Sequence, residues 1–204
     1  MHVEFLVEEP SAEAALMRIV PRIIGMEHTF RVHPHQGKQG LLKELASRLR
    51  GYAKWLPDDW RIVVLIDEDR DDCRRLKAQM EGAAKAARLL TKSTARTTSR
   101  VRIVNRIAVE ELEAWFLGDP DAVRIAYPRV SGTFERRAAY RHPDAVSGGT
   151  WEALERLLQR AGYFPGGLAK IATASAIAEH MAPDRNRSPS FAMFRRALTE
   201  LVGA

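Results

Sequence analysis

The sequence predicts an α/β fold in which a mostly parallel, four-stranded sheet is flanked by helices, with a helical C-terminal extension. Two observations predict it. From Met1 to about Arg106, short β-branched runs alternate with longer helical stretches, as in a doubly wound, Rossmann-like sheet. Beyond Ile107 the strand signal fades, and helices separated by Gly and Pro dominate. We therefore expect an α/β unit over residues 1–118 and a helical extension over residues 119–204 that packs on it.

The α/β unit should contain four strands, namely Val3–Val7, His28–His33, Arg61–Ile66 and Val101–Asn105. The third is the clearest, because its core Ile-Val-Val-Leu-Ile is apolar throughout, which is typical of a strand buried on both faces. A helix should follow each of the first three strands, over Ala12–Ile24, Leu41–Tyr52 and Asp71–Leu89. Ser11 can cap the first of these helices, and the polar segment Pro34–Gly40 is expected to form a loop.

The remainder of the chain reads as helical. The expected helices are Val109–Leu117, Trp151–Ala161, Ala169–Met181 and Ser190–Val202. Between the first two, Tyr127–Gly149 is rich in Pro, Gly and Arg and should be irregular.

The composition bounds the functional class. The 204 residues carry 32 Lys and Arg against 26 Asp and Glu, so a formal net charge of +6 and an isoelectric point near 9.8 favour a polyanionic partner. The one cysteine, Cys73, can form neither an internal disulfide nor a cysteine-based zinc site. No signal-peptide pattern opens the chain, and no apolar run approaches the roughly 18 to 20 residues that span a bilayer. We expect a soluble, cytoplasmic protein that does not enter membranes.

Two acidic clusters, each at the end of an apolar strand, carry the functional signal. Glu8 and Glu9 follow the first strand, and Asp67-Glu68-Asp69 follows the third. An open α/β sheet binds its ligands beyond the C-terminal ends of its strands, so these carboxylates should converge there. Such oxygen ligands suit Mg²⁺ or Mn²⁺, and crowded like charges demand a cation or a proton. The competing interpretation is that the acids in residues 67–72 only cap and solvate the start of one helix.

Four segments of the chain carry a resemblance to a known family. They are Val7-Glu8-Glu9-Pro10-Ser11, Asp67-Glu68-Asp69-Arg70-Asp71-Asp72, Glu111-Leu112-Glu113-Ala114-Trp115 and Asn186-Arg187-Ser188-Pro189-Ser190-Phe191. Together they resemble the bacterial family named domain of unknown function 4276, which is grouped with TOPRIM proteins, and the resemblance spans nearly the whole chain. The two acidic strand ends are similar to those of the TOPRIM domain in topoisomerases, bacterial primases and overcoming-lysogenization-defect nucleases.

The resemblance implies roles for particular acids. In TOPRIM proteins the first-strand glutamate acts as general acid or base and the Asp-x-Asp pair holds Mg²⁺, so these roles map to Glu8, Asp67 and Asp69. Glu9 stands where the TOPRIM pattern has glycine, which leaves open whether Glu8 or Glu9 faces the metal. Asp71 is a candidate additional metal ligand.

Glu113 is the candidate fourth acid of the site. It lies soon after the fourth strand and can reach the same edge of the sheet, and the resemblance favours it. Composition alone favours a capped amphipathic helix start at this point. The neighbouring Trp115 either packs beneath the site or stacks on a base.

Five basic residues are candidates for contacting a nucleic-acid backbone, namely Lys38, Arg70, Arg106, Lys170 and Arg187. Lys170 is the candidate for neutralising the scissile phosphate. The alternative interpretation of each basic cluster is an ordinary solvent-exposed surface that binds no ligand. The sequence around Gly37-Lys38 is no phosphate-binding P-loop, since no glycine precedes it at the required spacing and no Ser or Thr follows the lysine.

Features that the sequence lacks exclude two of the activities found among TOPRIM proteins. A topoisomerase needs DNA-gate domains and a primase needs large flanking modules, and neither fits 204 residues. We expect a metal-dependent nuclease that cleaves DNA or RNA. The resemblance alone suggests a bacterial defence module with an ABC- or SMC-like ATPase partner, and a homodimer is a further expectation. The alternative is a non-catalytic regulatory or nucleic-acid-binding adaptor. A phosphatase of the haloacid dehalogenase kind is disfavoured, because the expected Thr or Val is missing after the Asp-x-Asp.

Overall fold

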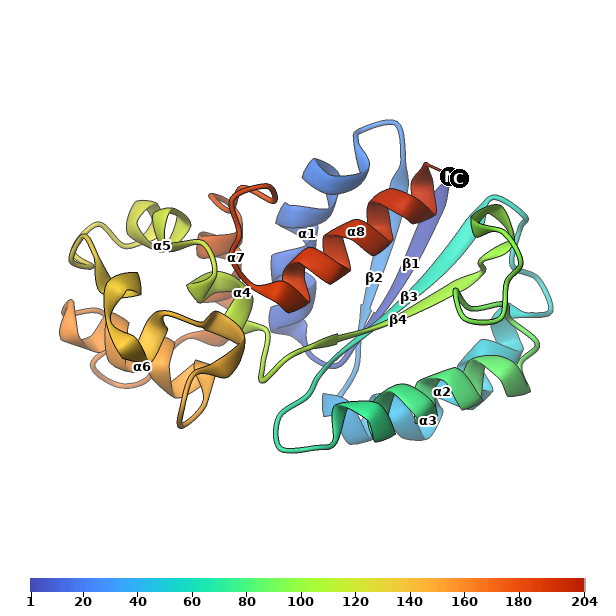
Figure 1. Cartoon of the computed structure of the whole chain (residues 1–204), viewed down its shortest axis with the longest axis horizontal. Coiled ribbons are helices and arrows are strands. Elements are labelled where there is room, and N and C mark those ends of the chain that lie inside the picture. The colour runs from blue at the N-terminus through green and yellow to red at the C-terminus, as the bar shows by residue number, and fades with distance from the viewer. Residues whose placement is uncertain (204) are drawn as a thin grey trace.

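Four strands lie side by side in one fully parallel sheet (Figure 1). The computed structural model describes residues 1–203, and its strands are β1 (His2–Val7), β2 (Thr29–Pro34), β3 (Trp60–Asp67) and β4 (Ile103–Ala108). They are ordered β2-β1-β3-β4, with Val7 opposite Leu65 and Asp67 opposite Ala108. This arrangement confirms the predicted α/β, Rossmann-like fold.

Helices cover both faces of the sheet. Helices α1 (Pro10–Ile24) and α8 (Pro189–Val202) lie on one face, and α2 (Gly37–Tyr52) and α3 (Cys73–Ala86) lie on the other (Figure 1). Along β1, Val3, Phe5 and Val7 face the first pair, whereas Leu6 faces the second. Because β3 is central and buried on both sides, it needs apolar residues at consecutive positions, which explains its uninterrupted apolar run.

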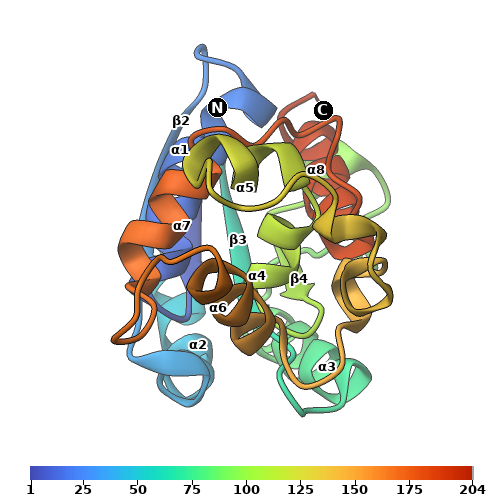
Figure 2. The same ribbon diagram turned by 90° about the vertical axis from the view of Figure 1, so that its left-hand side faces the viewer.

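The helical extension gathers beyond the C-terminal ends of the strands. It comprises α4 (Glu113–Leu117), α5 (Pro120–Ala126), α6 (Thr150–Arg160) and α7 (Lys170–Ala178), which stand in front of the sheet in Figure 2. Helix α7 packs along α1, and α8 then returns to the sheet. Within residues 1–203, no helix has the length and apolar character needed to cross a bilayer.

Asp119 fastens the start of α5 to the segment before α8. Its fully buried carboxylate accepts a hydrogen bond from the Ala182 backbone N–H at 2.8 Å. It also pairs with the Arg185 guanidinium at 2.9 and 3.1 Å. A buried carboxylate is tolerated only where such partners satisfy it, so these contacts fix the start of α5 against the segment before α8.

Trp115 is a second fastening point. It is fully buried, packs against Phe191 and Phe194, and donates its indole N–H to Ser190 Oγ at 2.9 Å. The Asn186 side chain donates to the Trp115 carbonyl at 2.7 Å. Of the two expectations for Trp115, packing is therefore the one observed. The Asn186–Phe191 motif supplies contacts within the fold.

Several predicted boundaries were wrong. Helix α2 begins at Gly37, where the backbone φ is 78°, so only His35 and Gln36 separate it from β2, in place of the predicted Pro34–Gly40 loop. The fourth strand is shifted to Ile103–Ala108 because Val101 still belongs to the preceding turn. The helix predicted from Val109 begins only at Glu113, since Glu110 is left-handed with φ 60°.

Two local features of the helices also differ from the prediction. Helix α5 was missed, although Asp119-Pro120 is a capping residue followed by the residue favoured at the first helical position. Ser11 does not cap α1, because its hydroxyl donates to the Glu9 carboxylate instead.

The segment Tyr127–Gly149 was predicted to be irregular. Apart from the chain turn that follows α5, it contains only three short 3₁₀ turns in residues 134–145.

Gly118→Ala should loosen the junction between α4 and the segment before α8. An alanine Cβ would lie 2.3 Å from Asn186 Oδ1 and 3.0 Å from the Ser188 backbone nitrogen. We expect the free energy of unfolding, measured by urea denaturation, to fall by roughly 1–3 kcal/mol.

The matched control is Gly82→Ala in α3, where a Cβ meets nothing within 4 Å. Alanine should stabilise this helix by roughly 0.5–1 kcal/mol. Equal stability of Gly118→Ala and the wild type would contradict the account of this junction.

Candidate active site

The predicted acids lie at the C-terminal edge of the sheet, where the strand order changes direction. The chain leaves β1 toward β2 on one side and leaves β3 toward β4 on the other. Glu8 directly follows β1, Asp67 ends β3, and Glu113 begins α4 after β4. Open α/β sheets bind ligands at such switch points, because the loops diverge there and leave a crevice.

Glu8 and Asp67 are in contact. Glu8 Oε2 accepts a hydrogen bond from the Asp67 backbone N–H at 3.2 Å. Burial, and then the neighbouring charges of Glu8 and Glu113, raise the pKa of Asp67 well above its ordinary range. Burial also raises the pKa of Glu8 to about 7, although the backbone hydrogen bond opposes the shift. The structure therefore brings the first-strand and third-strand acids together, as the sequence predicted.

Glu113 belongs to the same group of acids. Its side chain is buried, with 4% of the residue exposed, and burial raises its pKa to about 7. Its charge contributes to the raised pKa of Asp67, which places it within electrostatic range of the Glu8–Asp67 pair. Three ionisable groups at one desolvated edge are arranged so that they cannot all be charged without a compensating cation.

The loops after β3 and β4 hold each other in place. The Asp69 backbone N–H donates to the Glu110 carbonyl at 2.7 Å, and the Glu110 N–H donates to the Glu68 carboxylate at 3.3 Å. Asp69 and Glu110 both have left-handed backbones, with φ of 52° and 60°. Such conformations are costly outside glycine and are retained where surrounding contacts fix them, often at functional sites.

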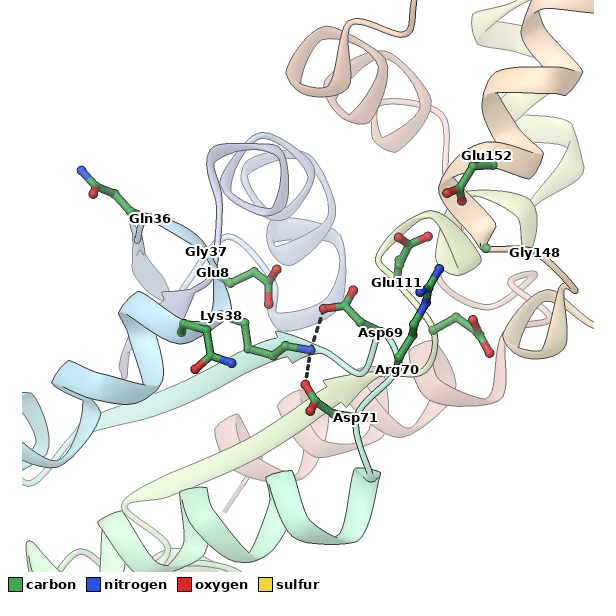
Figure 3. A pocket seen from close by; sticks show the side chains of 13 residues that line it. Glu8, Gln36, Gly37, Lys38, Asp69, Arg70, Asp71, Glu111, Gly148 and Glu152 are labelled. Carbon is green, nitrogen blue, oxygen red and sulfur yellow. Dashed lines mark ion pairs between the residues drawn. The ribbon is translucent and has the colours of Figure 1, made fainter.

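Lys38 reaches this edge from the start of α2. Its ammonium lies 2.6 Å from Asp69 Oδ2 and 2.7 Å from Asp71 Oδ2 (Figure 3). It also donates to the Glu68 carbonyl at 3.0 Å and to the Asp67 carbonyl at 3.3 Å. Burial alone would lower the pKa of Lys38, but the hydrogen bonds and charges of the two aspartates raise it, so the ammonium stays protonated.

Lys170 approaches from the opposite side, at the first residue of α7. Its ammonium lies 3.7 Å from Glu9 Oε1 and 4.5 Å from the centre of the Trp151 ring. Burial would lower the pKa of Lys170, but nearby carboxylates, led by Glu9 and Glu113, raise it. The helix dipole disfavours a lysine at a helix N-terminus, so the nearby carboxylates are what keep Lys170 protonated.

The contacts of Glu9 separate it from its neighbour Glu8. The Glu9 carboxylate accepts a hydrogen bond from the Ser11 hydroxyl and pairs with the Lys170 ammonium, whereas Glu8 contacts Asp67. Glu8 is therefore the member of the pair that lies beside the third-strand acid.

An open cleft of about 850 Å³ is lined by Glu8, Lys38, Asp69 and Asp71, whereas Asp67, Glu113 and Lys170 are not among its lining residues. Figure 3 shows the carboxylates of Glu8 and Asp69 pointing into the same space, with Arg70 and Glu111 across from Lys38. Six of the lining side chains are acidic and two are basic, the latter being Lys38 and Arg70. The cleft is therefore strongly acidic within a chain of positive net charge.

The other predicted phosphate contacts are distributed differently. Arg70 is exposed and lines the cleft. Arg106 lies within edge strand β4, and Arg187 is exposed on the segment before α8; neither lines the cleft. Lys38 lines it but is paired with two aspartates. Sequence clustering of arginines did not predict which of them face the acids, because that depends on where the loops fold.

The comparison with protein families covers both parts of the fold. The model of the family described as Domain of unknown function (DUF4276) matches residues 7–199. The chain belongs to the DUF4276 family. The match covers the α/β unit and the helical extension, so both parts of the site fall within it. Comparison with curated proteins found no match, and comparison with solved structures found none.

The donor groups of this DUF4276 chain fit a metal ion only in part. In the portion of the chain that the structure describes, no three His, Cys, Asp or Glu side chains are grouped as a ready-made metal site. Asp69 and Asp71, two of the four predicted ligands, turn toward Lys38. Glu8 and Asp67 remain adjacent. This pair suits Mg²⁺, which proteins commonly bind through one or two carboxylates, with water and substrate phosphate completing the shell.

Sequence reasoning missed the role of Glu111. Its carboxylate accepts hydrogen bonds from the Trp151 backbone N–H at 2.7 Å and from the Thr150 hydroxyl at 2.9 Å, and so caps the N-terminus of α6. Gly148 and Gly149, both with positive φ, lead the chain into this helix. The Gly-Gly pair before a helical segment was the available signal, but the distant capping acid leaves no local pattern.

Glu113→Gln should alter how stability depends on pH in metal-free protein. A carboxylate whose pKa rises from about 4.5 to about 7 on folding favours the folded state at low pH, and this contribution is lost as pH rises across that interval. The variant cannot ionise, so it should have a flatter profile. By about pH 8 it should be more stable than the wild type by up to about 3 kcal/mol relative to the difference at about pH 4.

Urea unfolding with a chelator present measures this difference. Glu27→Gln, which removes an exposed carboxylate, is the matched control and should keep the wild-type profile. Identical pH profiles for Glu113→Gln and the wild type would sink the electrostatic account of Glu113.

Proposed function

We propose that this chain is a Mg²⁺- or Mn²⁺-dependent nuclease of TOPRIM type that hydrolyses phosphodiester bonds in DNA or RNA. The observation that carries the proposal is the group of buried acids at this edge: the Asp67 backbone N–H contacts Glu8, which lines the cleft, and the buried Asp67 carboxylate lies within electrostatic range of Glu8 and Glu113. A site that desolvates several acids beneath an open cleft is suited to a divalent cation.

The acidity of the cleft supports a metal in particular. A nucleic-acid backbone carries one negative charge per phosphate and is repelled by a cleft with six acidic side chains. A cation held by Glu8 and Asp67 would offset that repulsion. Binding of nucleic acid at this cleft is therefore expected to depend on the metal.

In this proposal Glu8 and Asp67 hold the ion, with Glu113 as a supporting acid. When bound, the ion activates water and stabilises the charge that develops on the phosphate. The TOPRIM resemblance makes Glu8, the first-strand glutamate, also the candidate for transferring the proton. Lys170 supplies positive charge to the phosphate from the α7 side, and Arg70 binds the backbone at the cleft wall.

The cellular setting remains part of the proposal and rests on the TOPRIM resemblance. We place the protein in the cytoplasm, in a bacterial defence module, with an ABC- or SMC-like ATPase partner. A homodimer is compatible with this setting. No motor motif stands in the sequence, so energy-dependent steps belong to the partner.

One observation favours a second function. Since Lys38 already offsets part of the charge of Asp69 and Asp71, the chain can keep part of its acidic edge folded without a metal, as an adaptor protein would require. The buried Asp67 beside Glu8 argues against this alternative, because a scaffold gains nothing from desolvating a second set of acids.

Asp67→Asn and Glu8→Gln should abolish or strongly reduce metal-dependent cleavage. The assay incubates plasmid, single-stranded DNA and tRNA with each protein in Mg²⁺, in Mn²⁺ or in chelator. Loss of the proton-transferring group should lower the rate of Glu8→Gln by roughly 10²- to 10⁴-fold. Glu27→Gln is the control for removing one negative charge and should cleave as the wild type does.

Cleavage that is equal for the wild type and Asp67→Asn would refute the assigned site. Cleavage that persists in chelator would refute its dependence on metal. If no protein cleaves, Mn²⁺ binding by calorimetry decides between the two functions, since the adaptor needs no ion at Asp67.

A further inference from the structure

Lys38 lies in a cage of four oxygen atoms. Two come from the carboxylates of Asp69 and Asp71, at 2.6 and 2.7 Å, and two from the carbonyls of Glu68 and Asp67, at 3.0 and 3.3 Å. Only 8% of Lys38 is exposed. Figure 3 shows the side chain extended so that its ammonium lies between the two aspartates.

The cage has the composition of a cation site. Carboxylate and backbone carbonyl oxygens are the donors that hard divalent cations take from proteins. An ammonium forms three directed hydrogen bonds and here meets four oxygens, so it acts largely as a compact positive charge. Its position at the start of α2 adds no stability, because the helix dipole opposes a cation there.

The cage lies next to the proposed metal position. The charge of Lys38 acts on Glu8, and that of Asp69 acts on both Glu8 and Asp67. The ammonium itself donates to the Asp67 carbonyl at 3.3 Å, so the cage directly adjoins the residue that is proposed to hold the ion. Two-metal phosphodiesterases place two ions roughly 3.5–4 Å apart beside the reacting phosphate.

We propose that Lys38 permanently occupies the place of a second cation, so that the site takes one divalent ion, at Glu8 and Asp67. Lys38 is then a positioning residue. It fixes Asp69 and Asp71 and supplies positive charge that a second ion would otherwise bring. This inference rests on the proposed metal-dependent function and specifies the number of ions in its site.

Counting bound Mn²⁺ tests the inference without relying on activity. Isothermal titration and electron paramagnetic resonance of free Mn²⁺ give the number of ions per chain. The wild type should bind one. Lys38→Ala should bind two, because the vacated oxygen cage now accepts a hydrated ion.

Two further variants serve as controls. Lys43→Ala removes an exposed lysine from the same helix and should bind one ion. Lys38→Ala combined with Asp71→Asn should also return to one, because the second ion loses a carboxylate of the cage. If Lys38→Ala does not fold, by circular dichroism, Lys38→Gln carries the same expectation of two ions.

The outcomes separate the inference from the function on which it rests. Two ions on the wild type, or one ion on a folded Lys38→Ala, would overturn the inference and leave the nuclease proposal standing. No ion on the wild type would overturn the metal-dependent function and, with it, this inference.

Discussion

The balance of charge at the C-terminal edge of the sheet is the constraint on which the rest of the site depends. Parallel strands bring Asp67 beside Glu8, and α4 brings Glu113 within range, all largely removed from water. Such a group is stable only when protons or cations offset its charge. Lys38 and Lys170 approach it from two sides, each with a pKa raised by acids of the edge. A divalent ion would supply the positive charge that the two lysines leave missing.

The helical extension completes this balance. Glu111, on the loop after β4, caps α6, and α6 presents Trp151 beneath the ammonium of Lys170. Asp119 and Trp115 hold the extension against the segment that enters α8. The α/β unit supplies Glu8, Asp67 and Lys38, and the extension supplies Glu113 and Lys170, so both parts that the family match spans contribute to this edge.

The sequence was sufficient to predict the meeting of Glu8 and Asp67, because acids that follow apolar parallel strands must share one edge of the sheet. The sequence was not sufficient to predict where the side chains of Asp69 and Asp71 point. Their direction depends on Lys38, and hence on α2 starting at Gly37, a residue that otherwise disfavours helix. The role of Glu111 was equally hidden, since it depends on partners that tertiary packing brings to it. The Asn186–Phe191 motif, which carries part of the family resemblance, makes hydrogen bonds within the fold.

A crystal soaked in Mn²⁺ and measured for anomalous scattering tests the central claim most directly. The account predicts one peak per chain, within about 2.5 Å of carboxylate oxygens of Glu8 and Asp67, with Lys38 still between Asp69 and Asp71. A map without a peak at this edge, or with the ion bound elsewhere, would contradict it.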